Sequence, residues 1–153
     1  MNTLTFKKVR PGAVAPQRAT AGSAGYDLSA AIDAPVTVAP GETARIPTGI
    51  AIQLEPGYVA LIFGRSGLGI KHGVVPANAV GVIDSDYRGE LVVGLTCQHR
   101  EPYVVQPGER IAQLLLLPVA TPPVEEAEEL EETARGAGGF GSTGISAERG
   151  GKR

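Results

Sequence analysis

The chain has 153 residues, of which 42% are hydrophobic, and its formal net charge at pH 7 is −2. This length and composition suit one globular domain with a sizeable core, and 21 glycines and 12 prolines indicate many turns. The small negative charge argues against a general surface for nucleic acid or for anionic membranes, although it permits a local cluster of cations that binds a small anion.

The cysteine and histidine content narrows the chemistry further. Cys97 is the only cysteine and lies in an apolar run, which favours a buried, unreactive thiol. Since no disulfide can form within the chain, we expect a cytoplasmic location. His72 and His99 lack the spacing typical of a zinc site. The first residues lack the apolar core of a signal peptide, and no apolar run approaches the ~20 residues that span a membrane.

Short β-rich runs separated by turn residues follow one another for most of the length. In chain order, strands are predicted over residues 4–9, 26–31, 35–39, 44–54 with a break near Pro47, 58–63, 74–75, 80–83, 90–97, 103–105 and 110–119. Proline-glycine pairs mark turns between several of these runs. Since no helical periodicity precedes residue 119, the pattern predicts an all-β domain over residues 1–134, either a sandwich, a jelly roll or a barrel.

The end of the chain has a different composition. Residues 125–133 are acidic and have some helix propensity, but Leu130 is their only large apolar residue, so a helix would have little to bury. Residues 135–153 form a glycine-rich C-terminal arm. Plain disorder is one interpretation of the arm. The presence of Arg135 and Phe140 among the glycines suggests another, in which the arm becomes ordered on a ligand.

Two segments in the middle of the chain have residues suited to binding or chemistry. The turn predicted at residues 64–69 contains Arg65 and Ser66, and could direct backbone N–H groups at a phosphate; a tight turn without a ligand is the alternative. Gln113 lies in an otherwise apolar strand, where its amide needs a partner, either in the core or on a ligand.

The segment 82–89 joins two apolar runs through Asp84, Asp86 and Tyr87. On a continuous strand the two carboxylates would share a face, and burying two like charges together is costly. We therefore predict a hairpin with Gly89 near its turn, and a solvated surface hairpin is the interpretation without a function. Asp27 stands between apolar neighbours near the start of a strand, where a structural turn is the alternative to a functional role.

Five segments, taken together and in order, resemble the five motifs of the homotrimeric dUTPases: residues 24–28, 64–69, 81–89, 108–114 and 135–144. The resemblance extends from Leu4 to Gly144. It implies a jelly-roll-like β-barrel subunit with a flexible arm that closes over the active site, and a homotrimer with active sites between subunits. It also implies an extended link over residues 125–132, and hydrolysis of dUTP to dUMP and pyrophosphate with Mg²⁺, which lowers dUTP and supplies dUMP for thymidylate synthesis.

The resemblance also assigns roles to individual residues. Asp84 would activate the water that attacks the α-phosphorus, with help from Gln113. Asp27 would meet Mg²⁺ only through water, because the triphosphate itself holds the ion. The expected phosphate-binding residues are Arg65, Ser66, Gly67, Gln113, Arg135, Ser142 and Thr143.

Base and sugar selection would fall to the residues around the third motif. Backbone N–H and C=O groups at Asn78, Ala79 and Gly81 would distinguish uracil from cytosine. The two bases exchange hydrogen-bond donor and acceptor at N3 and position 4, and backbone groups cannot make the same exchange. The ring of Tyr87 would exclude a 2′-hydroxyl, and Phe140 of the arm would stack on the uracil.

Two alternatives share this fold. A dCTP deaminase carries a catalytic glutamate at the position of Gly94 and a further arginine at the position of Ile70, so both positions count against deamination. A non-catalytic deoxynucleotide-binding protein would be expected to lack Asp84 or the arm, and both are present.

Overall fold

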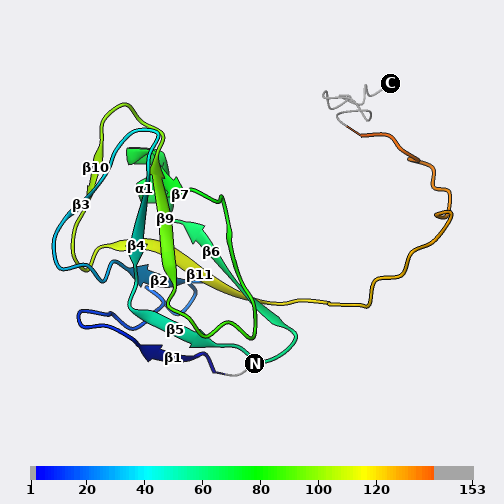
Figure 1. Ribbon diagram of the computed structural model, residues 1–153, viewed down its shortest axis with the longest axis horizontal. Helices are drawn as coiled ribbons and strands as arrows, with labels where there is room; N and C mark the ends of the chain where they lie inside the picture. Colours follow the sequence, from blue (N-terminus) through cyan, green and yellow to red (C-terminus); the bar gives the residue numbers. More distant parts are fainter. Residues whose placement is uncertain (1–2, 140–153) are drawn as a thin grey trace, which may run out of the picture. The chain divides into compact units, whose positions relative to one another are not determined.

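The computed structural model describes residues 3–139 and divides the chain into two units, Met1–Thr121 and Pro122–Arg153. In the first unit the elements follow one another in the order β1 (Thr5–Lys8), β2 (Tyr26–Ser29), β3 (Val36–Val38), β4 (Thr43–Pro47), β5 (Ile50–Gln53), β6 (Tyr58–Gly64), α1 (Ser66–His72), β7 (Val74–Pro76), β8 (Gly81–Ile83), β9 (Val92–Cys97), β10 (Tyr103–Val105) and β11 (Arg110–Pro118). Figure 1 shows this unit as a set of short strands with one short helix. The prediction of an all-β fold is confirmed.

The strands form four small antiparallel sheets. A four-stranded sheet has the order β2-β11-β6-β8, and a three-stranded sheet has the order β4-β9-β7. The other two sheets are the pairs β1-β5 and β3-β10. Because β11 lies between β2 and β6, it brings the early strand β2 beside the middle of the chain (Figure 1).

The core is aliphatic, as expected for a chain without tryptophan. Its largest fully buried side chains include Leu28, Ile46, Leu95 and Leu114, which come from β2, β4, β9 and β11. Alternate residues of β9 point inward, ending with Cys97, whose thiol is buried and donates toward the carbonyl of Glu101 at 3.3 Å. The prediction of a buried Cys97 is confirmed.

The prediction that no helix precedes residue 119 is wrong. The segment expected to be a tight turn starts helix α1, which buries Leu68 and ends at Gly73, whose φ of 66° lets its N–H bond the carbonyl of Gly69. Gly67 and Gly69 have low helix propensity, so packing of Leu68 and the glycine cap decide the structure here.

The hairpin expected over residues 82–89 is also absent. β8 pairs with β6, whereas β9 pairs with β4 and β7, so residues 84–91 cross from one sheet to the other. A turn starts this crossing, because the N–H of Tyr87 bonds the carbonyl of Asp84 at 3.2 Å. Strand partners are chosen by long-range packing of both faces, which overrides the local turn signal at Gly89.

The second unit, within residues 122–139, has no helix or strand. In particular, residues 125–132 are not helical, in agreement with the expected extended link. Arg135 Nε donates to the carbonyl of Gly138 at 2.9 Å within a local turn. In the part of the chain that is described, no helix has the length and apolar character needed to cross a membrane.

Candidate active site

A first cavity of about 630 Å³ lies where β2, β6 and β11 meet the start of α1. The antiparallel register places Gln113 of β11 opposite Asp27 on one side and opposite Phe63 on the other. The predicted residues that line this cavity are Asp27, Arg65, Ser66, Gly67 and Gln113. Five residues that are scattered over the sequence are therefore brought together by one strand.

Asp27 organises the cations of the first cavity. Its side chain is only 15% exposed, so its charge needs partners. Oδ1 accepts from Arg65 Nε at 3.1 Å, and Oδ2 accepts from Arg110 Nη1 at 2.9 Å. Arg65 also donates to the carbonyl of Arg110 at 3.3 Å. Two arginines and one carboxylate leave a net positive charge, which suits an anion.

Sequence reasoning missed Arg110 as a site residue, although it lies in the fourth motif. The signal was available at Asp27, since a carboxylate between apolar neighbours on a strand requires a cation nearby. That signal does not identify the partner, because residues 27 and 110 are joined only through the pairing of β2 with β11.

Gln113 satisfies both interpretations that its sequence position left open. Its Nε2 donates to the carbonyl of Gly64 at 2.9 Å, so the amide is anchored within the protein, and its side chain also lines the first cavity. A Cβ atom at Gly25 would lie 3.0 Å from Gln113 Oε1, so glycine at this position keeps the amide oxygen uncrowded.

Ser66 and Gly67 begin helix α1 and are exposed. The backbone N–H groups in the first turn of a helix have no carbonyl one turn earlier to bond, and the helix has no side-chain cap at Arg65. These N–H groups and the Ser66 hydroxyl are therefore further hydrogen-bond donors in the first cavity, beside the Arg65 side chain.

A second cavity of about 270 Å³ lies beside the crossing from β8 to β9. Its lining includes Asp84, Tyr87, Glu90 and Arg45. Asp84 is exposed, and among residues 3–139 no ion pair involves it. Tyr87 is 44% exposed and donates from its hydroxyl to the backbone carbonyl of Glu90 at 3.1 Å. A free carboxylate thus stands beside an aromatic ring in an open cavity.

A third, narrower cavity of about 120 Å³ is lined by Asn78 and Gly81, and it shares Val82, Ile83 and Val92 with the second. A Cβ atom at Gly81 would come within 3.2 Å of Ile62 Cβ, so glycine keeps this cavity open. Ala79 has a φ of 62°, which is rare for a residue with a side chain, and lines a neighbouring cavity with Gly64. Such backbone strain is found most often at functional sites.

The predicted site residues thus fall into two groups on one chain. The first cavity has no lining residue in common with the second or the third. Arg135 belongs to the second unit, which is described by itself. Phe140, Ser142 and Thr143 lie outside the described residues.

Comparisons with known proteins agree with one another. The dUTPase family model matches residues 12–144. A deoxyuridine 5'-triphosphate nucleotidohydrolase from Desulfitobacterium hafniense is 54% identical over 132 residues, which cover 86% of this chain and 87% of that protein. The protein of the same name from Thiobacillus denitrificans is 55% identical over 130 residues, which cover 84% of this chain and 89% of that protein.

Solved structures give the same result. The dUTPase of Staphylococcus bacteriophage 80alpha, solved with dUpNHpp, superposes with a TM-score of 0.82 at 32% identity. The match covers 95% of this chain and 100% of that one. A variant of the dUTPase from phage phi11 of S. aureus, described with a structural Mg(II) ion, has a TM-score of 0.77 at 29% identity, over 86% and 100% of the two chains.

Proposed function

The chain belongs to the dUTPase family, and on this premise we propose that it is a dUTP diphosphatase, which hydrolyses dUTP to dUMP and pyrophosphate. The observation that carries the proposal is the first cavity, whose lining brings Asp27 and its partner Arg65 beside the start of α1, while Asp27 also pairs with Arg110. Cations with fixed geometry and backbone donors are the groups that a triphosphate requires.

The triphosphate lies in the first cavity in this proposal. Arg65, Ser66 and the N–H of Gly67 bind its oxygens, and Gln113 holds the attacking water or an α-phosphate oxygen. Because Asp27 fixes the Arg65 side chain before the substrate arrives, little side-chain entropy is lost when the phosphates bind.

Asp84 is the general base. Its carboxylate is exposed and has no ion pair in the described part of the chain, so it is able to accept a proton from water. The water oxygen bonds to the α-phosphorus in line with the bridging oxygen, whose bond to that phosphorus breaks, and pyrophosphate leaves. Placement of the water and neutralisation of the oxygens account for most of the catalysis.

The nucleoside occupies the second and third cavities. Asn78 and Gly81 read the uracil at the narrow third cavity, where little room remains for a methyl group, and Ala79 contributes from the neighbouring cavity that it lines with Gly64. Tyr87 lies in the second cavity and its ring excludes a 2′-hydroxyl.

The enzyme is a homotrimer with an active site at each subunit interface. Support comes from the division of the site residues, since the first cavity shares no lining residue with the second and third cavities, which hold Asp84, Tyr87, Asn78 and Gly81. A first cavity from one subunit then meets the nucleoside cavities of its neighbour. The C-terminal arm, with Arg135, Phe140, Ser142 and Thr143, closes over the assembled site.

Mg²⁺ fits this arrangement as a ligand of the triphosphate. The ion prefers phosphate oxygens and water to a cage of protein groups. Asp27 is the single carboxylate among the residues lining the first cavity, and each of its oxygens bonds one arginine and keeps a lone pair for a metal-bound water. When bound, the ion neutralises charge that develops on the phosphates.

The test is the release of pyrophosphate from dUTP, UTP, dCTP and dTTP, measured in parallel with and without Mg²⁺. We expect hydrolysis of dUTP to exceed that of each other nucleotide by at least about 10²-fold. Ammonia release from dCTP would identify a deaminase, and tight binding of dUTP without turnover would identify a binding protein.

A further inference from the structure

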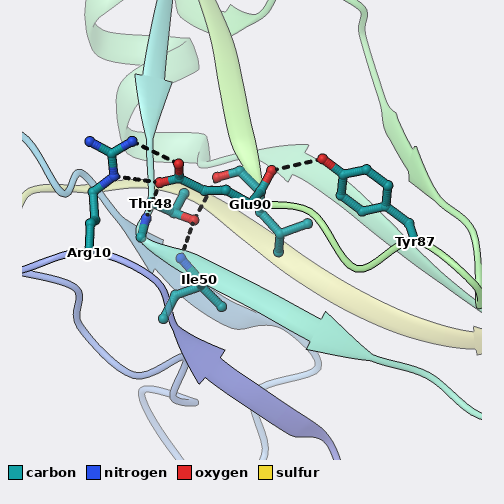
Figure 2. Close-up of polar contacts among 7 residues, drawn as sticks. Arg10, Thr48, Ile50, Tyr87 and Glu90 are labelled. Carbon is teal, nitrogen blue, oxygen red and sulfur yellow. Dashed lines mark hydrogen bonds and ion pairs between the residues drawn. The ribbon is translucent and has the colours of Figure 1, made fainter.

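The crossing segment 84–91, which contains Asp84 and Tyr87, is tied to the N-terminal part of the chain by one ion pair (Figure 2). Arg10 donates from Nε to Glu90 Oε1 at 2.7 Å and from Nη2 to Oε2 at 2.8 Å. The backbone N–H of Gly49 donates to the same Oε1 at 2.8 Å. Three donors from two other segments therefore hold the Glu90 carboxylate.

The backbone of Glu90 also contacts Tyr87. Figure 2 shows the Tyr87 hydroxyl directed at the backbone carbonyl of Glu90, to which it donates at 3.1 Å. The Tyr87 ring also lies against Gly89, where an added Cβ atom would overlap the ring. Since Tyr87 is 44% exposed, this hydrogen bond and the bare backbone of Gly89 are what orient the ring.

The close contact between Arg10 and the backbone of Gly49 requires glycine at position 49. Gly49 has a φ of 69°, and a Cβ atom there would lie 2.8 Å from Arg10 Cγ and 2.6 Å from the Cβ of Ala13. Glycine therefore lets the stem of Arg10 pack on the backbone and reach Glu90 with both nitrogens. The Arg10 hydrogen bond also lowers the pKa of Glu90, which favours the ionised carboxylate.

The C-terminal end of the crossing segment has anchors of its own. The Thr48 hydroxyl donates to the carbonyl of Leu91 at 2.7 Å, and the N–H of Leu91 donates to the carbonyl of Ile50 at 2.7 Å. Arg88 holds the loop internally by donating to the carbonyls of Ser85 and Tyr87. Removal of Arg10 should therefore leave Leu91 and β9 in place and loosen only the Glu90 carboxylate, which keeps the single donor from Gly49.

We propose that Arg10 is a positioning residue for sugar selection, which acts through Glu90 to hold the Tyr87 ring where a 2′-hydroxyl would lie. The proposal rests on the proposed function, because it gives Tyr87 its role at the sugar. The bidentate geometry and the third donor from Gly49 fix the orientation of the Glu90 carboxylate more closely than a single hydrogen bond would.

The experiment compares Arg10→Met, Glu90→Gln, the double variant and Tyr87→Ala with the wild type. For each protein, kcat and KM are measured for dUTP and UTP, and hydrogen exchange is measured over residues 84–91 without ligand. We expect Arg10→Met to raise the UTP-to-dUTP ratio of kcat/KM by about fivefold, with kcat for dUTP within about twofold and faster exchange of the segment.

Two further variants separate orientation from charge. Lys8→Met removes one cation from the same N-terminal segment without touching Glu90, and it should leave the ratio unchanged. Arg10→Lys keeps the charge but loses the pair of hydrogen bonds that the guanidinium makes to Glu90. Its UTP-to-dUTP ratio of kcat/KM should therefore lie between the ratios of the wild type and of Arg10→Met. Because Arg10 and Glu90 act as a unit, the double variant should change the ratio no more than Arg10→Met alone.

The outcomes distinguish this proposal from the proposed function. A wild type that releases no pyrophosphate from dUTP rejects the function itself. Normal dUTP hydrolysis together with an unchanged ratio in Arg10→Met rejects the role of Arg10, whatever the exchange rate. A change in the ratio that Lys8→Met reproduces would replace positioning by a general effect of charge.

Discussion

At the scale of single residues, the two carboxylates of the proposed site differ in their partners. Asp27 bonds two arginines, whereas Asp84 is exposed and has no ion pair within residues 3–139. A carboxylate that is already paired positions its partners, and one that is free can accept a proton. The same substitution should therefore have different consequences at the two positions.

Asp84→Asn should leave dUTP binding largely intact and lower kcat by at least about 10²-fold, because the amide keeps the shape but cannot take a proton. Asp27→Asn should instead raise KM, since Arg65 and Arg110 lose their common acceptor. Steady-state kinetics and binding of a non-hydrolysable dUTP analogue check both. Normal turnover by Asp84→Asn would move the base to another residue.

At the scale of secondary structure, short β-rich runs between turn residues predicted most of the strands, because strands such as β9 bury alternate residues in an aliphatic core. The site within the first cavity was predictable as a set of residues but not as a geometry. Gln113 and Asp27 become neighbours only through the pairing of β11 with β2. The helix at Ser66–His72 and the sheet change after Ile83 were missed for the same reason, because distant packing decides both.

Tyr103 connects β10 to the segment before β11 and to the end of α1. Its hydroxyl, on β10, donates to Glu109 just before β11, and its ring lies 4.9 Å from that of His72 at the end of α1. Burial, followed by the hydrogen bond to Glu109 and the charge of that carboxylate, raises the pKa of Tyr103 to about 12.

This raised pKa predicts a loss of stability in alkali. The native state favours the neutral phenol, so the stabilisation is complete below the unfolded pKa of 10.0 and is lost as the pH rises toward about 12. Between about pH 9 and about pH 11, the wild type should lose on the order of 1 kcal/mol more than Tyr103→Phe. Urea unfolding of both proteins at each pH measures this, and equal losses would contradict it.

At the scale of the whole molecule, the proposed trimer makes each active site from more than one chain. Mixed trimers of Arg65→Gln and Asp84→Asn subunits, refolded together, should recover activity at about a quarter of their sites, because some sites receive both intact residues. Mixing Arg65→Gln with Gln113→Ala is the matched control, since both changes fall in the first cavity. No recovery in the first mixture would place the site within one chain.

The C-terminal arm gives a second prediction at this scale. A chain ending at Ala134 should fold and trimerise, because every strand of the described structure ends at or before Pro118. It should hydrolyse dUTP far more slowly, since Arg135 and the arm residues beyond it are gone. Size-exclusion chromatography and pyrophosphate release test the two parts separately. Full activity of the shortened chain would remove the arm from the mechanism.

The position of β11 between β2 and β6 has a consequence for biosynthesis. The ribosome makes β2 more than eighty residues before β11, its partner strand, in which Gln113 pairs with Asp27. Until β11 emerges, the edges of β2 and β6 that will pair with it keep their backbone N–H and C=O groups unpaired and open to other chains. A nascent chain therefore lacks the complete first cavity until β11 is made, and its yield should depend on how well the cell shields those edges until then.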